Sequence, residues 1–521
     1  MLSQKADIWR WSVLIPALLL AMPVLVVFGS VLSPDVEVWR HLRHTVLADY
    51  VVNSLLLAFG TGAGALLIGT VTAWLVSQYQ FFGRRVLQWL LLLPLAMPAY
   101  IIAYTYTGML DFAGPVQSWL RSYFDWAYGD YWFPEIRSLS GAILMLSLVL
   151  YPYVSMLARS AFREQSTSML EASRTLGFSP RQHFWKVALP LARPALLTGV
   201  ALAMMEAFAD YGTVQYFGIA TFTTGIFRTW FGMGSQGGAA QLAALLSSFV
   251  LLLLVLEQWS RRKIRYFYQG QRQHISPLRS LAPTRQLVVA LLCLLPVLLG
   301  FVVPAIQLAS WAWPNVLTLF TADFGRLIWN SFSLAAIAAV LSVVLALLFG
   351  YASRLRRDPL VRLPVRLAAL GYAIPGTVIA IGVRIPLAWL DRNIDLLAEQ
   401  WFDIRTGLLL SGTLFALLLA YSVRFLAVSL HSVEAGLERI KPSMDNAARS
   451  LGASPLQVLR RVHVPLLRGS VLTALMLVFV DVLKELPATL ILRPFNFNPL
   501  AVRTYELASD ERLADAALPA L

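Results

Sequence analysis

Four acidic residues lie within apolar stretches of the chain and form two pairs of identical spacing. Glu206 and Asp210 are four residues apart, and Asp481 and Glu485 repeat this arrangement 275 residues later. A spacing of four places both carboxylates of a pair on one face of a helix. Because ionisable groups at membrane depth usually face a protein interior or a water-filled path, we expect the four carboxylates to converge on one polar route.

A second interpretation of the acidic pairs needs no such route. It places the acids near the outer ends of their helices, where they pair with Lys484, Arg228 or Arg503. Such pairs would gate or pack the helices without touching a cargo. The sequence leaves both interpretations open.

Residue sets for catalysis or nucleotide binding are absent from the sequence. No Gly-x-x-x-x-Gly-Lys-Ser/Thr motif occurs to hold the phosphates of a nucleotide. The six histidines are scattered, and Cys293 is the one cysteine. We therefore expect a subunit that is not an enzyme, that has no cofactor, disulfide or resident metal site, and that takes its energy from a partner.

A polar, basic segment is written twice between apolar stretches. Residues Ser168–Arg193 recur as Ser443–Arg468, and 13 of the 26 positions are identical. Gly177 is expected to end one short helix, and Ser179 to cap a second, which ends at Pro190. The repeat thus predicts two L-shaped knobs that project from the membrane, and interfacial amphipathic helices are the alternative.

The composition places these segments in a polytopic membrane protein. Hydrophobic residues make up 58% of the chain and charged residues 13%, and the mean hydropathy is +0.66. The net charge of +14 is carried by short loops beside apolar stretches, which favours a topological role over nucleic-acid binding. Eleven spans are predicted, near residues 11–31, 50–77, 87–109, 139–159, 194–213, 239–257, 287–308, 327–353, 366–388, 407–429 and 468–490.

The loops between the spans differ in charge, and this difference predicts the orientation. Residues 259–285 hold seven basic residues and no acid, and residues 351–366 hold five arginines and one acid. Residues 111–138 and 391–405 each hold four acids and two arginines. Because basic loops stay on the cytoplasmic side, we expect the N-terminus and both repeated segments to be cytoplasmic.

The repeat extends beyond the polar segments, since Asn53-Ser54 recurs as Asn330-Ser331. We expect a first transmembrane domain over residues 1–258, a basic cytoplasmic linker over 259–285 and a second domain over 286–521. Both domains have the same orientation, so the symmetry axis runs along the membrane normal. The second domain is expected to lack its sixth helix because the sequence is truncated. A native protein of eleven spans is the alternative.

The repeated segments, Glu-Ala-Ser followed by Gly177 and Leu-Pro190 in the first copy, resemble the coupling motif of membrane subunits of type I ATP-binding-cassette importers. The whole chain is similar to the fused double permeases of the ferric-iron uptake subfamily, in stretches such as residues 103–111, 132–137 and 481–487. The resemblance implies an all-α polytopic fold of two six-helix importer domains in tandem, in the bacterial inner membrane.

The resemblance also implies partners and site residues. The partners are two ATPase subunits, an extracytoplasmic substrate-binding protein and membrane lipid, and no nucleic acid is expected. The implied ATPase-coupling residues are Glu171, Ala172, Gly177, Pro190, Asn446, Ala447, Gly452 and Pro465. In the family the position of Glu171 pairs with a basic residue of the ATPase. Asn446 replaces this acid in the second copy, with Asp445 one position earlier, so the charge contact is not expected there.

Several functions remain open at the level of the sequence. Ferric iron prefers oxygen ligands, so the two acidic pairs suit transient passage of this ion or attraction of its cationic complex. Permeases for thiamine, sulfate or polyamines share the coupling motif. An ion-coupled secondary transporter would share the repeat and the intramembrane acids, and a membrane scaffold would explain the docking segments but not the acids.

Overall fold

The structure is a computed structural model, and it describes residues 2–127, 129–164, 173, 175, 177–262, 278–316, 321–356 and 358–521. The described chain is almost entirely helical, which confirms the predicted all-α class. Within this part the strands are β1 (Tyr79–Gln80) and β2 (Arg279–Ser280), which pair in parallel.

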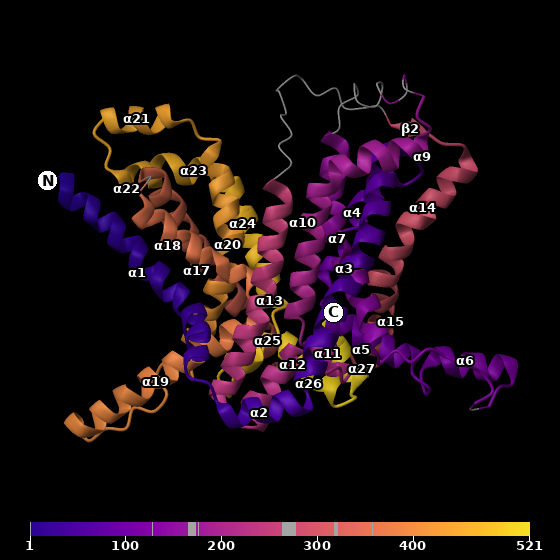
Figure 1. Cartoon of the computed structure of the whole chain (residues 1–521), viewed down its shortest axis with the longest axis horizontal. Helices are drawn as coiled ribbons and strands as arrows, with labels where there is room; N and C mark the ends of the chain where they lie inside the picture. The colour runs from indigo at the N-terminus through magenta and orange to yellow at the C-terminus, as the bar shows by residue number, and fades with distance from the viewer. Residues whose placement is uncertain are drawn as a thin grey trace. The chain divides into compact units, whose positions relative to one another are not determined.

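In the first sequence half, long spanning helices alternate with short helices (Figure 1). In chain order they are α1 (Leu2–Gly29), η1 (Ser30–Leu32), α2 (Val36–Thr45), α3 (Leu47–Gln78), α4 (Arg84–Leu90), η2 (Leu93–Ala96), α5 (Ala99–Leu110), α6 (Pro115–Phe124), α7 (Leu139–Glu164), α9 (Pro180–His183), η3 (Phe184–Ala188), α10 (Leu189–Ala209), α11 (Gly212–Tyr216), α12 (Phe222–Phe227), η4 (Arg228–Gly232) and α13 (Gln236–Arg262).

The second half also alternates long and short helices. Its helices are α14 (Pro283–Val297), η5 (Leu298–Val302), α15 (Val303–Ala312), η6 (Trp313–Asn315), α17 (Ala322–Leu355), α18 (Pro359–Ala369), η7 (Leu370–Ala373), α19 (Gly376–Phe402), α20 (Leu414–Glu438), α21 (Pro442–Ser450), α22 (Pro455–Val458), η8 (Leu459–His463), α23 (Val464–Leu466), α24 (Arg468–Leu483), α25 (Pro487–Leu492), α26 (Leu500–Ser509) and α27 (Leu513–Ala520).

Eight helices in the described residues are long and apolar enough to cross a membrane, and two bent pairs raise the number to ten. These ten match ten of the eleven predicted spans. The span expected near 366–388 is instead divided among α18, η7 and α19. The physical reason is the proline that follows Ile374, because a residue before proline avoids the helical region, and Ile374 is extended at ψ 131°. Met97 before Pro98 divides the equivalent stretch of the first half in the same way.

The chain forms two compact units that interleave in sequence. The first unit is Met1–His41, Ile226–Ser247 and Phe320–Thr504, and the second is Leu42–Gly225, Ser248–Leu319 and Tyr505–Leu521. The first helix of each sequence half therefore packs in the unit formed mainly by the other half. The predicted domains describe the sequence repeat and do not coincide with these units, and most of the predicted linker lies outside the described residues.

Small residues allow these exchanged helices to pack closely. In the first unit α1 packs on α18 and α19, and Gly382 of α19 faces the backbone of Pro23 in α1. In the second unit, a Cβ on Gly300 of η5 would lie 2.8 Å from the carbonyl oxygen of Leu148 in α7. Close helix approach at glycine is typical of membrane proteins, where packing replaces the hydrophobic effect.

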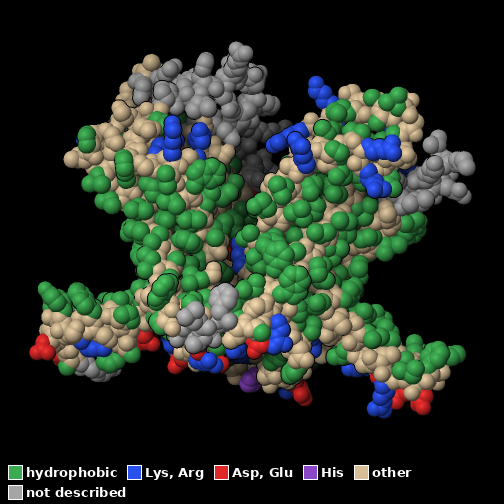
Figure 2. All heavy atoms as spheres, turned by 180° about the vertical axis from the view of Figure 1, so that it is seen from behind, with side chains coloured by type: hydrophobic (Ala, Val, Ile, Leu, Met, Phe, Trp, Pro, Cys, Tyr) green, Lys and Arg blue, Asp and Glu red, His purple; other side chains and the backbone are tan. Residues whose placement is uncertain are grey.

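The surface of each unit is divided by chemistry. In Figure 2 hydrophobic side chains cover the flanks of each unit, and Lys and Arg gather without acids toward one of its ends. The acidic side chains visible on this face lie toward the opposite end of each unit, among further basic ones. This distribution is typical of a helical protein whose flanks contact lipid.

Candidate functional site

The first repeated segment turns sharply at Gly177, as the sequence predicts. Gly177 has a φ of +77°, which L side chains rarely adopt, and the amide of Phe178 donates to the carbonyl oxygen of Ser173 at 3.0 Å. This bond closes a Schellman-type helix end. The predicted coupling residues Glu171 and Ala172 lie outside the described residues.

The second repeated segment ends helix α21 with the same motif. Gly452 has a φ of +83°, its amide donates to Arg449 at 2.9 Å, and the amide of Ala453 donates to Ala448 at 3.1 Å. These are the two bonds of a complete Schellman motif. Among the described residues, no atom beyond the chain neighbours lies within 4 Å of a Cβ built on either Gly177 or Gly452, so the backbone conformation requires glycine there.

A serine caps the next helix in both copies. The Ser179 amide donates to Gln182 Oε1 at 2.8 Å, and the Gln182 amide donates to Ser179 Oγ at 3.3 Å. Ser454 and Gln457 form the same reciprocal pair at 2.8 and 3.4 Å. These capping boxes confirm the predicted helix start after the turn.

The helices that follow the caps differ between the two copies. The predicted end at Pro190 is wrong, because α9, η3 and α10 run on as one helix from Arg181 to Ala209. Pro190 lies inside this helix, just after the π-helical turn η3, where the regular hydrogen-bond pattern is already interrupted. In the second copy the arm Pro455–Leu466 is bent by 77° from α24, and the predicted span 468–490 begins after it. Leu467, at the bend, leaves the regular helical conformation.

The described coupling residues are accessible to a partner. Their exposed members are Gly177, Pro190, Asn446, Ala447, Gly452 and Pro465. Leu451, between two of them, is 89% exposed. Asp445 is buried instead. It therefore does not replace the missing acid at Asn446 on the exposed face.

In the first unit a buried ionic network holds the second segment. Arg354 Nε at the end of α17 donates to Asp445 Oδ2 at 2.9 Å, and its other nitrogens donate to the carbonyl oxygens of Leu437 and Ile440. His463 Nε2 lies 2.7 Å from Asp445 Oδ1 and donates to it, because an ionised carboxylate only accepts. The network joins α17, α20, α21 and η8.

The surroundings of this network lower the pKa of both Asp445 and His463. Burial raises the pKa of Asp445, but hydrogen bonds from Arg354 and His463 outweigh it and hold the pKa below its usual value. Burial lowers the pKa of His463 below its usual value, against the opposing effect of Asp445. The network is therefore most stable with Asp445 ionised and His463 neutral.

The first segment is held by different side chains in the second unit. Ser173 Oγ lies 2.8 Å from His183 Nδ1, and the ring of Trp74 on α3 packs 4.8 Å from Phe184 between ring centres. Tyr351 on α17 is the sequence equivalent of Trp74. Its hydroxyl donates to the carbonyl oxygen of Pro455 at 2.8 Å in the first unit. An aromatic residue on the long spanning helix thus supports each segment.

Sequence reasoning missed Arg354, His463 and their contact with Asp445. Asp445 was considered only as a displaced surface acid. Arg354 is 91 residues from Asp445, and no local pattern links them. Comparison of the two copies offers one signal, because His463 replaces Ala188 while most neighbouring motif positions keep their type.

In the second unit the first acidic pair lies where a spanning helix breaks. Helix α10 ends at Ala209, and Asp210 accepts hydrogen bonds from the Thr213 amide at 3.1 Å, the Thr213 hydroxyl at 3.1 Å and the Val214 amide at 3.2 Å. Asp210 thus caps the short helix α11. Glu206 lies one turn earlier and is partly buried.

In the first unit the second acidic pair has equivalent positions. Glu485 accepts from the Ala488 amide at 3.1 Å and so caps α25, and its carboxylate lies 3.4 Å from Arg424. Asp481 pairs with Lys484 at 2.9 Å, as the second interpretation of the acids expects. The partner Arg424, on α20, was not anticipated.

The acidic pairs belong to different units, so their predicted convergence stays a prediction. No group of three or more His, Cys, Asp or Glu side chains that could hold a metal ion occurs within the described part of the chain. Within each unit, Asp210 and Glu485 accept hydrogen bonds as helix caps, and Glu485 also forms an ion pair with Arg424. These contacts fix the break in the spanning helix.

Comparison with known proteins decides the family. The family described as "Binding-protein-dependent transport system inner membrane component" matches residues 65–266 and 342–496. The chain belongs to this family. The two matches cover more than half of the chain, and each includes one repeated segment with its Schellman glycine. This inner membrane component is therefore a multi-pass membrane protein with two family domains in tandem, and it is a transport subunit.

Relatives of this inner membrane component include full-length and half-length proteins. It is 26% identical to the Fe(3+)-transport system permease protein FbpB 2 of Haemophilus influenzae, over 90% of this chain and 86% of the relative. It is 25% identical to the ferric transport system permease protein FbpB of Actinobacillus pleuropneumoniae, over 89% and 67%. The molybdenum transport system permease protein ModB of Haemophilus influenzae is 26% identical over 42% of this chain and 95% of its own length.

Proposed function

We propose that the chain is the membrane-spanning permease of an ATP-driven importer that receives ferric iron from an extracytoplasmic binding protein. The observation that carries the proposal is the duplicated turn, in which Gly177 and Gly452 adopt positive φ and exposed residues surround each glycine. A surface that only contacts lipid does not require the same backbone turn twice. A rigid partner that binds both copies does require the same turn in each.

The proposed partners of the two segments are two ATPase subunits. The exposed residues near Gly452 include Asn446, Ala447, Arg449 and Leu451, which a partner can contact. Closure of an ATPase dimer would move both segments, and the helices that continue from them would carry the movement into the bundle. The chain itself has no phosphate-binding motif, so the energy comes from these subunits.

The proposed orientation puts both segments and the N-terminus in the cytoplasm. The charge of the loops supports it, because residues 351–366 are rich in arginine and residues 391–405 are rich in acids. Figure 2 agrees with this assignment, because on the face that it shows Lys and Arg gather at one end of each unit.

The cargo is proposed from the relatives and from the acidic pairs. Two relatives that align along most of this chain are named for ferric iron, whereas the molybdenum and sulfate permeases align with less than half of it. The acids Glu206, Asp210, Asp481 and Glu485 stand at breaks of spanning helices, and discontinuous helices form the ion sites of many transporters. We include these four residues in the proposal as part of the route, or the gate, of the cargo.

Reconstitution with a panel of cargoes tests the proposal. The purified chain, its ATPase subunits and its binding protein would be placed in vesicles, and uptake of radiolabelled ferric iron, thiamine and sulfate would be compared with ATP present. The proposal predicts uptake of ferric iron above the other two. Uptake of thiamine or sulfate instead would overturn the cargo but leave the importer class intact.

A further inference from the structure

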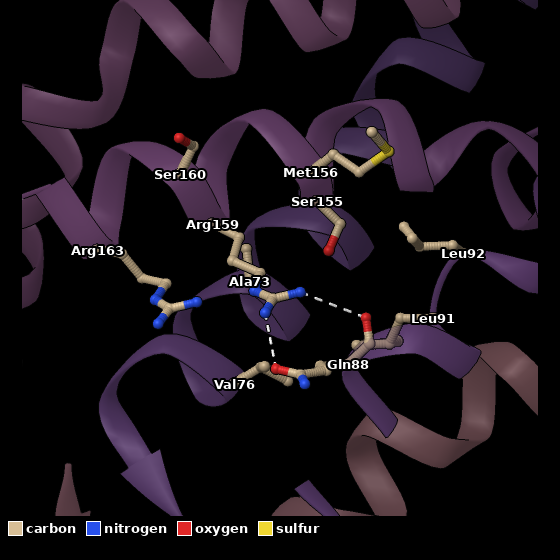
Figure 3. A pocket seen from close by; sticks show the side chains of 10 residues that line it. All are labelled: Ala73, Val76, Gln88, Leu91, Leu92, Ser155, Met156, Arg159, Ser160 and Arg163. Carbon is tan, nitrogen blue, oxygen red and sulfur yellow. Dashed lines mark hydrogen bonds between the residues drawn. The ribbon is translucent and has the colours of Figure 1, made fainter. Parts of the chain in front are cut away.

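A pocket of about 460 Å³ opens in the second unit where α3, α4 and α7 meet near the end of their spans (Figure 3). We call it the Arg159 pocket. It is lined by Ala73, Val76, Gln88, Leu91, Leu92, Ser155, Met156, Arg159, Ser160 and Arg163. Its volume lies within the range of small-molecule sites, and its lining combines apolar and hydroxyl side chains with two guanidinium groups.

The positive charge of the Arg159 pocket has no acidic counterpart in the described part of the chain. Gln88 holds Arg159 in place, because Arg159 donates to its Oε1 at 2.7 Å and to its carbonyl oxygen at 3.4 Å, as Figure 3 shows. These acceptors are neutral. Arg84 and Arg85 add charge nearby, and no acid among the described residues forms an ion pair with them, with Arg159 or with Arg163.

The equivalent pocket in the first unit is lined by acids as well as arginines. It has a volume of about 630 Å³, and we call it the Glu434 pocket. At the repeat distance of 275 residues, Glu434 and Glu438 replace Arg159 and Arg163. These two acids and Asp445 line the pocket together with Arg354, Arg362, Arg366 and Arg449. One backbone framework thus carries a pocket lined by both charges in one unit and, among the described residues, a pocket lined only by positive charge in the other.

The surroundings of the Arg159 pocket are apolar. Phe82, Val86 and Trp89, on and beside α4, expose most of their side chains, and Met156 lines the pocket while half exposed. A ligand with only an anionic group would leave these side chains in water. A ligand that combines an anionic head with acyl chains would cover them and gain about 25 cal/mol for each Å² of apolar surface removed from water.

We propose that the Arg159 pocket binds the phosphate-bearing headgroup of an anionic phospholipid. The guanidinium groups of Arg159 and Arg163 contact the phosphate, for which their planar fork of donors is suited. The acyl chains lie along Met156 and the exposed side chains of α4. The site is independent of cargo and of the ATPase subunits. Basic pockets between spanning helices are known to accept such headgroups.

Native mass spectrometry of the purified full chain tests the proposal. The chain is titrated with phosphatidylglycerol and, in parallel, with phosphatidylcholine, and bound lipids are counted. We expect phosphatidylglycerol to bind selectively, and the R159Q/R163Q double variant to bind it about 30-fold more weakly. The single variant Arg163→Gln keeps the test valid if the double variant fails to fold, because the side chain of Arg163 is exposed.

The Glu434 pocket supplies the matched control. The R362Q/R366Q variant also removes two arginines, and it should leave phosphatidylglycerol binding unchanged. Equal binding of both lipids, or equal loss in this control, would overturn the proposal. Displacement of the lipid by inorganic phosphate at similar concentration would also overturn it, because the pocket would then recognise a free anion. Each outcome is independent of transport and so does not depend on the proposed function.

Discussion

The two repeated segments share a backbone but not the side chains that hold it. Around Gly177 and Gly452 the turn, the capping box and the π-helical turn that follows fall at the same positions. Yet Ser173 and His183 support the first segment, whereas an ionic network centred on Asp445 supports the second. The conserved part is therefore the shape offered to a partner, and the support beneath it is free to change.

The difference also separates exposed from buried chemistry. An acid at the position of Asn446 would point outward. Asp445 points inward instead, where Arg354 and His463 donate hydrogen bonds to its carboxylate. A shift of one residue on a helix turns a side chain by about 100°, which is enough to exchange the two environments. The second copy thus carries its acid on the inward face of the helix.

Removal of the ionic network should have the largest effect on this comparison. Asp445→Ala leaves the charge of Arg354 partly buried and unpaired, so we expect the second segment to lose about 3 kcal/mol of local stability. Hydrogen exchange of residues 442–466 measures this loss. Ser173→Ala, the matched change in the first segment, should cost only about 1 kcal/mol. Equal losses in both segments would contradict the distinction.

Substitution at the two turn glycines should act on both segments alike. Gly177→Val and Gly452→Val each force a β-branched residue into positive φ, which costs about 1–2 kcal/mol. Because the space around each glycine is open, the cost is conformational and not steric. We expect equal loss of ATPase association in co-purification, with the fold of the spans unchanged. A much larger effect at one glycine would show that the two turns are not equivalent.

Acidification should weaken the second segment. The pKa of His463 and the pKa of Asp445 both lie below their usual values in the fold. Each group therefore stabilises the segment above its unfolded pKa, and this stability is lost as the pH falls from about 6.5 toward the folded pKa values. Hydrogen exchange across this range should show faster opening of residues 442–466, and His463→Gln, which removes the titrating ring, should flatten the dependence just below about pH 6.5. A pH-independent opening rate would refute the assignment.

Loss of either serine cap should produce the smallest effect. Ser179→Ala and Ser454→Ala each remove one hydrogen bond to a helix start, and we expect about 1 kcal/mol in each segment. Exchange of the amides at Gln182 and Gln457 reports the change directly. Serine replaced by threonine at the same positions is the control, because threonine also caps. A clearly larger effect of one serine substitution than of the other would show that the shared backbone motif is not equivalent in the two segments.

Local features of the sequence predicted the backbone of the segments. Glycine before a Ser-Pro pair specifies a helix end and a new start within a few residues, so Gly177 and Ser179 were correctly assigned. The network of Arg354 could not be predicted, because its members are brought together by packing of distant helices. The path of the helix through Pro190 was misjudged because proline usually ends a helix, whereas here a π-helical turn precedes it and the helix continues.

The arrangement of the spans shows the same limit. Hydropathy located ten spans that the structure supports, because each is a continuous apolar stretch. It did not show that Pro375 divides the eleventh, nor that α1 and α14 pack in the unit of the other half. Those results depend on contacts across hundreds of residues, such as that of Gly382 with Pro23, and one sequence does not encode them in a local pattern.

The account depends most on the claim that the two segments connect the permease to an ATP-hydrolysing motor. Uptake of radiolabelled ferric iron into vesicles that hold the chain and its binding protein tests this claim, with the ATPase subunits present or omitted. The account predicts ATP-dependent uptake with the subunits, none without them, and a strong loss in the G177V/G452V double variant. Uptake that persists in the absence of the ATPase subunits would contradict it.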